Sequence, residues 1–235
     1  MMNKLIKSTF LSIAKKIKVY KLIQKGVMID RPNTIDIKGE LSIGSQVNMD
    51  SNIIFKGNVE IKDRVSIDHN CILEDCIINS DVHIKSNSTI KGSIINSNSF
   101  IGPYARIRPK SNIGSNTQIG NFVEIKNSTI GKNCKINHLS FIGDTDMKDN
   151  VIIGAGTITC NYDGANTQKT QIGENAFIGS GVFLVAPIKI GENATIGSGS
   201  TVTKNAPSNK LTLERSEQIT IENWERPGKK SEAKE

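Results

Sequence analysis

Apolar residues recur at every sixth position over most of this chain, and this period restricts the fold more than any other feature. The step of six runs through an early series and a later series: Ile37, Ile43, Met49, Phe55, Ile61, Ile67 and Leu73, then Ile101, Ile107, Ile113, Ile119 and Ile125. A slip near residues 78–100 separates the two series. The later series continues through Ile130, Ile136 and Ile142 and then through Ile172, Ile178, Leu184, Ile190, Ile196 and Val202. A second register runs through Leu41, Val47, Ile53, Val59, Val65, Cys71 and Ile77 early, and its later members are mostly small residues such as Ala105, Ser111 and Thr117. An α-helix needs apolar spacing near 3.6, so the period excludes a helical domain.

A period of six fits a short strand followed by a corner, with Gly or Asn at the corner where the backbone takes positive φ. Three such units would close a triangular coil of about eighteen residues, with each strand parallel to the strand one coil earlier. The sequence therefore predicts a mainly β protein, a parallel β-helix over residues 31–204. Such a column contacts itself only between neighbouring coils, so it needs end caps and usually a partner.

Three segments fall outside the repeat. Residues 1–30 are predicted to contain an amphipathic helix that ends near Gly26, with Ile6, Phe10, Ala14, Ile17 and Ile23 on the face that docks on the first coil. Residues 161–170 interrupt the repeat, and a loop that leaves a rigid column is a common place for function. Residues 205–235 form a mixed-charge tail in which Trp224 is expected to pack on a coil or on a neighbouring subunit.

Charge and composition narrow the functional classes. Residues 1–31 carry eight Lys or Arg and one acid, whereas residues 32–235 carry 22 of each sign, so the net charge of +7 belongs to the first segment. With 5% aromatic residues and no basic–aromatic interleaving, nucleic-acid binding has little support. No apolar run approaches the ~18 residues that cross a bilayer, no cleavable signal is evident, and four Cys without metal-ligand spacing favour reduced thiols. We therefore predict a cytoplasmic protein without a membrane span, with a solvated or, less favourably, membrane-anchoring basic helix.

A few polar residues could carry chemistry. His138, one of three His, occupies an outward position and is either a general base or a surface residue. Arg108 and Lys126 are eighteen residues apart, so they are predicted to stack one coil apart, where they either hold a phosphate or form a solvated face. Glu124 lies within two residues of Lys126 on the same strand, where it could orient an imidazole.

Four runs resemble a known family: IGPYARIRP at 101–109, GNFVEIK at 120–126, IGAGTITCNYDGAN at 153–166 and LVAP at 184–187. They are similar to the C-terminal acetyltransferase domain of the bifunctional N-acetylglucosamine-1-phosphate uridyltransferase/glucosamine-1-phosphate acetyltransferases. The likeness extends from about Gly26 to Pro227, and residues 3–25 look like the helix that links the two halves. The uridyltransferase half is expected to lie outside this chain, which would be either a fragment or a stand-alone enzyme.

The resemblance implies a left-handed parallel β-helix that assembles as a homotrimer with active sites between subunits. The implied reaction moves acetyl from acetyl-CoA to the amine of glucosamine-1-phosphate, in the synthesis of UDP-N-acetylglucosamine for the cell wall, without a metal. The implied catalytic residues are His138 as general base and Glu124, which orients it. The implied substrate-binding residues are Arg108, Lys126, Phe141 and Ile152, and the implied acetyl-CoA residues are Ala155, Asn161, Tyr162, Ser180, Ser198 and Arg215.

The sequence departs from the family in the sugar half of the site. Phe141 stands where a Tyr is usual, Ile152 where an Asn is usual, and Thr167 where a Lys is usual, although Lys169 is close. These changes motivate a second hypothesis, a catalytically degenerate trimeric scaffold. A third, a metal-dependent β-helix enzyme, needs three converging His, but His69 and His83 are out of phase with an eighteen-residue coil.

Overall fold

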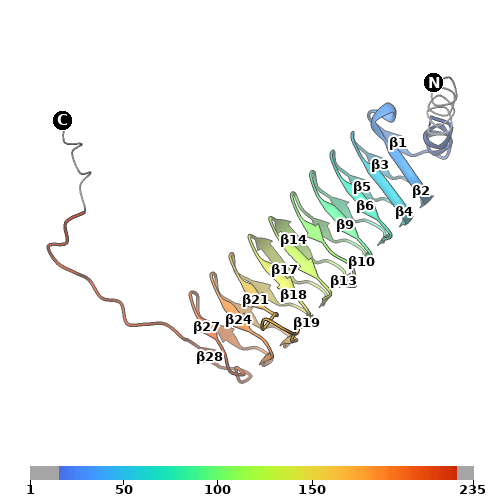
Figure 1. Ribbon diagram of the computed structural model, residues 1–235. Coiled ribbons are helices and arrows are strands. Elements are labelled where there is room, and N and C mark those ends of the chain that lie inside the picture. The colour runs from blue at the N-terminus through green and yellow to red at the C-terminus, as the bar shows by residue number, and fades with distance from the viewer. Residues whose placement is uncertain (1–15, 227–235) are drawn as a thin grey trace, which may run out of the picture.

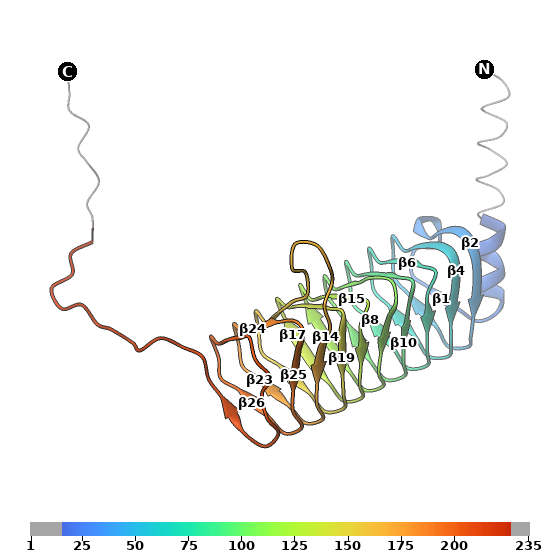
Figure 2. The same ribbon diagram turned by 60° about the horizontal axis from the view of Figure 1, so that its bottom comes forward.

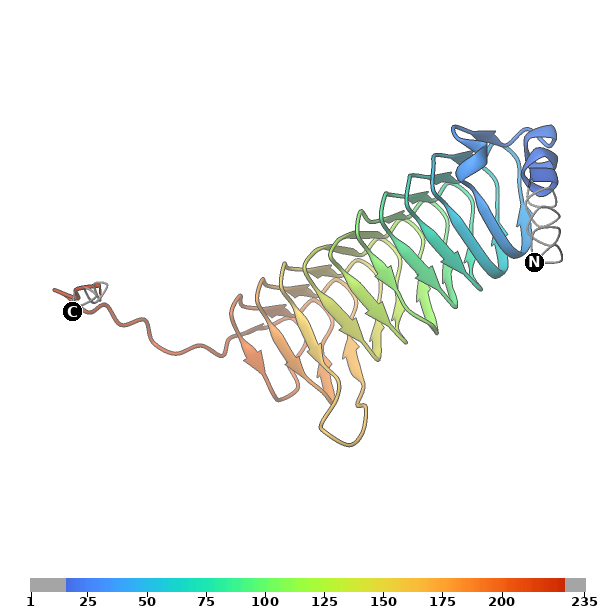
Figure 3. The same ribbon diagram turned by 45° about the horizontal axis from the view of Figure 1, so that its top comes forward.

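The chain folds into a straight three-sided column of parallel β-coils, with a helix across one end and an extended tail leaving the other (Figure 1). The computed structural model describes residues 16–226. Every named strand pairs in parallel with strands of adjacent coils, so the predicted parallel β-helix is confirmed. Figure 3 shows the coils stacked along one axis with the strands of each side in line.

The first face of the column is a sheet of eleven strands, each paired with the strand one coil earlier and one coil later. In order these strands are β1 (Met28–Ile29), β3 (Asn48–Met49), β5 (Ser66–Ile67), β8 (His83–Ile84), β11 (Phe100–Ile101), β14 (Gln118–Asn121), β17 (Lys135–His138), β20 (Ile152–Ile153), β23 (Phe177–Ile178), β26 (Thr195–Ile196) and β28 (Leu211–Thr212).

The other two faces form one sheet, because β2 (Asp36–Ile43) and β4 (Ile54–Ile61) run through the corner between them. The second face contains β6 (Ile72–Glu74), β9 (Thr89–Lys91), β12 (Arg106–Ile107), β15 (Glu124–Lys126), β18 (Phe141–Gly143), β21 (Ile158–Cys160), β24 (Phe183–Val185) and β27 (Thr201–Val202). The third face contains β7 (Ile77–Ile78), β10 (Ser93–Ile95), β13 (Ser111–Ile113), β16 (Thr129–Ile130), β19 (Thr145–Met147), β22 (Thr170–Ile172) and β25 (Ile188–Ile190).

The core is the predicted column of Ile and similar residues, fully buried from coil to coil. Each such side chain contributes about 1.5–3 kcal/mol by leaving water. Small inward hydroxyls fill the rest of the section and donate to backbone carbonyls, as Ser128 Oγ does to the carbonyl of Lys126 at 2.8 Å. Most buried hydroxyls are therefore satisfied, and among the described residues Thr170 Oγ1 is the exception.

The repeat is shorter than six at four places on the third face. The inward positions there advance by five residues instead of six: Leu73 to Ile78, Ile90 to Ile95, Ile125 to Ile130 and Ile142 to Met147. This explains the slip near residues 78–100. It also makes the assignment of Ile77 to the inward series wrong, since Cys76 and Ile78 are buried and Ile77 faces outward.

The corners are built from residues with positive φ, as the period predicts. At the corner between the third and first faces, Asn occupies most coils, and neighbouring amides bond along the column, for example Asn175 to Asn193 at 3.1 Å. Asn tolerates this backbone conformation better than most residues. We call the corner between the first and second faces the first corner; its residues in chain order are Asn52, Asn70, Asn87, Tyr104, Phe122, Leu139, Gly156, Gly181 and Gly199.

The helix at residues 16–24 closes the first coil and ends at Gly26, whose φ is +86°. Val19 and Leu22 are buried, whereas Ile17 and Ile23 are exposed, so the docking face predicted for them is wrong. The reason is the turn at Gly26, which must carry Val27 into the core and so brings its neighbours on the helix, Val19 and Leu22, inward. The predicted members Ile6, Phe10 and Ala14 lie outside the described residues.

Two short elements complete the ends. A 3₁₀ turn, η1 (Pro32–Thr34), leads into β2. At the other end β28 lies past the predicted boundary at residue 204, and the chain then leaves the column (Figure 1). Trp224 is 62% exposed, so the expectation that it packs on a coil of this chain is wrong. Within residues 16–226 no helix has the length and apolar character needed to cross a membrane.

Candidate active site

His138 is the last residue of β17, immediately before the first corner. Its side chain is exposed and lines a groove of about 380 Å³ on the first face. The groove is also lined by Lys85, Phe100, Gly102, Pro103, Gln118, Ile119, Gly120, Asn121 and Asn137. The imidazole therefore faces a solvent-filled depression and not the interior of the column.

The hydrogen-bond partner of His138 is Asn121, not Glu124. Nδ1 of His138 lies 2.7 Å from Oδ1 of Asn121, and the two residues are register partners one coil apart. Glu124 is on the second face, past the corner, where Oε1 accepts from Nη1 of Arg108 at 2.8 Å. Within this chain, the predicted orientation of His138 by Glu124 is therefore wrong.

The five-residue step determines which residue lies next to His138 in the preceding coil. The coil that contains Ile125 and Ile130 has seventeen residues, so Asn121 lies beneath His138. A uniform eighteen-residue coil would have placed Gly120 there. The signal was present in the sequence as the early return of Ile at position 130.

Arg108 and Lys126 lie one coil apart on the second face, as predicted. The N–H of Arg108 donates to the carbonyl of Ile125 at 2.8 Å, which sets the register of the pair. Each cation already has an acidic partner: Arg108 has Glu124, and Nζ of Lys126 lies 3.6 Å from Oδ2 of Asp144. These pairs hold both cations in place at the surface.

Phe141 and Ile152 lie on different faces. Phe141 is the register partner of Glu124 on the second face, and its Cζ lies 2.7 Å from the position that a Cβ on Gly143 would take. The ring is therefore directed along its strand and away from the first corner. Ile152, on the first face, is 41% exposed one coil above Lys135. Neither side chain carries a hydrogen-bonding group.

Three of the predicted cofactor residues line up with His138. Ala155, Ser180 and Ser198 each precede a glycine of the first corner, as His138 precedes Leu139. The backbone confirms the stacking, because Gly181 N–H donates to Ala155 at 2.8 Å and Gly199 N–H donates to Ser180 at 2.8 Å. Three coil spacings of ~4.8 Å place Ser198 about 14 Å from His138.

The corner beside this row is bare. A Cβ on Gly156 or on Gly181 would meet no atom closer than 3.8 Å, so side chains could fit there but none is present. We call the row of Gly156, Gly181 and Gly199 the glycine strip. Arg215 closes its far end, with Cδ 3.9 Å from the position of a Cβ on Gly199. The strip thus joins an imidazole at one end to a guanidinium at the other.

Asn161 and Tyr162 lie at the opposite edge of the second face, where the insertion leaves the column (Figure 2). The amide of Asn161 is buried and donates to Asp144 Oδ2. Burial alone would raise the pKa of Asp144, but hydrogen bonds from Asn127 and Asn161 and the ammonium of Lys126 outweigh it, so the net shift is downward. This carboxylate anchors the insertion. Within the chain Asn161 is therefore not grouped with the row at the glycine strip.

The insertion itself is an ordered hairpin. Tyr162 and Thr167 form an antiparallel bridge, and Tyr162 is 64% exposed. The backbone N–H of Asn166 is the main cause that lowers the pKa of Asp163 to about 2, with help from Gln168. The hairpin therefore projects from the column as a preformed arm (Figure 3).

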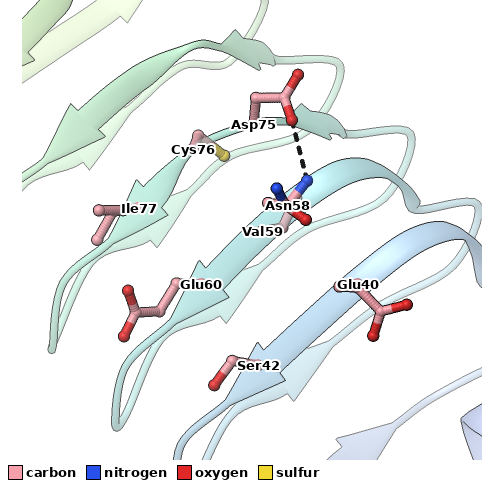
Figure 4. Close-up of a pocket in the computed structure, with 8 residues that line it drawn as sticks. All are labelled: Glu40, Ser42, Asn58, Val59, Glu60, Asp75, Cys76 and Ile77. Carbon is pink, nitrogen blue, oxygen red and sulfur yellow. Dashed lines mark hydrogen bonds between the residues drawn. The ribbon is translucent and has the colours of Figure 1, made fainter.

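A second groove, of about 470 Å³, lies at the third face near the start of the column (Figure 4). Its Asp75 accepts the N–H of Asn58 at 2.9 Å, and its Glu60 pairs with Lys62. Burial raises the pKa of Cys76, also in its lining, to about 12, so the thiol is not a nucleophile. This groove offers no reactive group.

The remaining histidines are paired with acids. His69 Nδ1 lies 3.2 Å from Asp50, and His83 Nε2 lies 2.8 Å from Asp68. Across residues 16–226 no three His, Cys, Asp or Glu side chains are grouped as a metal site would require. All four cysteines are free.

The repeat and the fold define the class of protein, a hexapeptide-repeat β-helix. Residues 169–204 match the family model of the bacterial transferase hexapeptide (six repeats), and residues 37–111 match that of the GMPPB C-terminal domain. Neither model covers half of the chain.

The chain is similar to the bifunctional protein GlmU, which confirms the resemblance predicted from the four runs. The identity is 54% over 100 residues with GlmU of Hydrogenovibrio crunogenus, covering 43% of this chain and 22% of the relative. It is 46% over 104 residues with GlmU of Chromobacterium violaceum, covering 44% and 23%. The matched segment thus spans less than a quarter of these relatives.

Solved structures with related coils are more distant. A mutant of perosamine N-acetyltransferase from Caulobacter crescentus, in complex with CoA and GDP-perosamine, is 23% identical with a TM-score of 0.44, covering 49% of this chain and 52% of that one. Arabidopsis UDP-N-acetylglucosamine acyltransferase is 19% identical with a TM-score of 0.46, covering 80% and 69%. These scores indicate only a distant resemblance.

Proposed function

We propose that this chain is an acetyl-CoA-dependent N-acetyltransferase that acetylates the amine of an amino-sugar phosphate. The similarity to GlmU supports glucosamine-1-phosphate as the acceptor and UDP-N-acetylglucosamine synthesis as the pathway. An acyltransferase of this kind needs a base beside room for a long, thin donor, and the exposed His138 next to the glycine strip supports this assignment.

The glycine strip is the observation that carries the proposal. In the six coils before it, the first corner carries a side chain, whereas from Gly156 onward it carries none. The change occurs one coil after His138. An extended pantetheine chain fits such a bare strip, with its thioester at His138 and its phosphates at the Arg215 end, because a guanidinium pairs well with phosphate.

His138 is the proposed general base. Its Nε2 accepts a proton from the sugar ammonium, so that the nitrogen lone pair attacks the thioester carbon. The C–N bond forms and the C–S bond breaks, the imidazolium gives its proton to the leaving sulfur, and the second proton that the nitrogen loses on becoming an amide is released to solvent. The products are the N-acetyl sugar and free CoA.

Arg108 and Lys126 are the proposed phosphate ligands. With Arg106, whose Nη1 lies 3.5 Å from Glu124 Oε2, three cations face the two carboxylates of Glu124 and Asp144. The excess positive charge favours an anionic acceptor. Phe141 and Ile152 add no hydrogen bond, so the phosphate must be held mainly by these cations.

A homotrimer is proposed to complete the site. Tyr104, Phe122 and Leu139 are each more than half exposed at the corner that carries His138, and such an apolar row suits contact with a second copy. In this arrangement the exposed Tyr162 of one copy would reach the glycine strip of the next, while Asn161 holds the base of the hairpin through Asp144. Phe122→Asn and Leu139→Asn should weaken assembly, measured by analytical ultracentrifugation; unchanged mass would contradict this.

The decisive experiment measures CoA release from acetyl-CoA with glucosamine-1-phosphate. His138→Gln should lower kcat at least 10²-fold, while His83→Gln, a matched change at an Asp-paired histidine, should leave it unchanged. No CoA release by the assembled wild-type protein would overturn the proposal. Calorimetry with acetyl-CoA then separates a true scaffold, which has no reason to bind it, from an enzyme with another acceptor.

A further inference from the structure

We infer that Asn121 is a positioning residue that sets the tautomer of His138, a role that rests on the proposed function for its catalytic meaning. Oδ1 of Asn121 lies 2.7 Å from Nδ1 of His138. A carbonyl oxygen can only accept a hydrogen bond, so Nδ1 must carry the hydrogen. The lone pair of the neutral ring then resides on Nε2, the atom that must take the proton.

The backbone holds the two side chains together. Asn121 and His138 are the last residues of β14 and β17 and are register partners. Directly after them the N–H of Leu139 donates to the carbonyl of Asn121 at 3.0 Å. The side-chain bond therefore bridges two coils at a point where the main chain is already fixed.

No carboxylate competes for the ring. Within residues 16–226 His138 forms no ion pair, since Glu124 is engaged by Arg106 and Arg108 across the corner. An amide acceptor orients the ring without adding a negative charge beside it. A carboxylate in the same place would favour the protonated ring, which cannot act as a base.

Substitution of Asn121 should therefore separate orientation from charge. Asn121→Leu, of similar size but without an acceptor, should lower kcat on the order of 10²-fold and change KM for acetyl-CoA less than twofold. Asn121→Asp should keep much of the rate at high pH but move the acid limb of the kcat profile to higher pH. Asn112→Leu is the matched control, because Asn112 is an exposed residue of the third face, outside the His138 groove, whose Oδ1 likewise accepts a hydrogen bond from the neighbouring coil, from Asn96 at 2.8 Å.

A spectroscopic measurement tests the inference without relying on activity. In ¹⁵N NMR of the three histidines, neutral His138 should be the Nδ1–H tautomer in the wild type and in Asn112→Leu. In Asn121→Leu it should shift toward Nε2–H, while His69 and His83 stay unchanged as internal references. An unchanged tautomer together with an unchanged kcat in Asn121→Leu would overturn the inference, and an Nε2–H tautomer in the wild type would do so as well. Failure of the proposed function would appear instead as an unchanged kcat in His138→Gln, while the His138 tautomer in the wild type and in Asn121→Leu is as expected.

Discussion

Replacement of Gly181 by Asn should weaken donor binding strongly and leave the fold intact. Gly181 has φ +66°, close to the +59° of Asn70 and the +61° of Asn87 in the same corner column. A Cβ at Gly181 meets only the backbone N of Gly199, at 4.0 Å. Asn therefore fits both the backbone and the space. Restriction of the unfolded chain favours the variant by about 0.4–1 kcal/mol, but the positive φ costs Asn more than Gly, so the two effects offset each other and the free energy of unfolding should change little.

The same side chain would occupy the middle of the glycine strip. If it displaces three or four methylene groups of the donor, at ~0.8 kcal/mol each, the loss is about 3 kcal/mol. This corresponds to roughly a 10²-fold weaker Kd for acetyl-CoA. Titration calorimetry measures the Kd, and urea denaturation measures the free energy of unfolding.

The reciprocal substitution is the control. Asn70→Gly, at the same corner but far from the strip, removes the amide hydrogen bonds to Asn52 and Asn87, so it should cost on the order of 1 kcal/mol of stability and leave the Kd for acetyl-CoA unchanged. Acetyl-CoA binding by a folded Gly181→Asn protein within threefold of wild type would refute the assignment of the strip. Unfolding of Gly181→Asn would refute the corner argument itself.

Three further outcomes follow from the packing and the charges. Asp144→Ala leaves the amides of Asn127 and Asn161 without their acceptor, so urea denaturation should show a loss of about 3 kcal/mol. The fold lowers the pKa of Asp163 to about 2, so the stability that Asp163 gives the hairpin is present above the unfolded pKa of 3.8 and is lost as the pH falls toward 2. Protease cleavage of the hairpin should therefore increase between pH 3.8 and 2, and Asp163→Asn should remove this pH dependence. Iodoacetamide at pH 8 should modify no cysteine except Cys160 before unfolding, because burial raises the pKa of the other three thiols to about 11 or 12; mass spectrometry would contradict this by showing early labelling of Cys71.

The architecture was predictable because the period of six is itself the geometry of a strand and a corner. What a uniform period could not supply was the local register. Five-residue steps such as Ile125 to Ile130 are hidden in a sequence where outward and inward positions can both be Ile. Burial decides such cases, and burial depends on the neighbouring coils.

The site was predictable in part. His138, Arg108 and Lys126 take the outward positions expected of them. The partner of His138 was not predictable from strand proximity. Glu124 follows Asn121, the actual partner, by only three residues, but the first corner lies between them. A corner turns the chain through a new face within two residues, so proximity along the chain does not mean contact.

The first corner shows where local preference yields to another demand. Tyr104, Phe122 and Leu139 adopt φ of 56°, 56° and 49°, which a bulky residue enters at a cost of roughly 1–2 kcal/mol. All three remain exposed, and the Tyr104–Phe122 ring stack at 5.3 Å recovers only a part of that cost. Asn in the earlier coils of the same column avoids the cost altogether. Since a domain is stable by only about 5–15 kcal/mol, three strained apolar residues in adjacent coils are best explained by contacts outside the chain, which is where the proposed homotrimer would bury them. The strained row ends and the bare strip begins within one coil of His138, which is the arrangement that the proposed base would need, with a neighbouring copy on one side and room for the donor on the other.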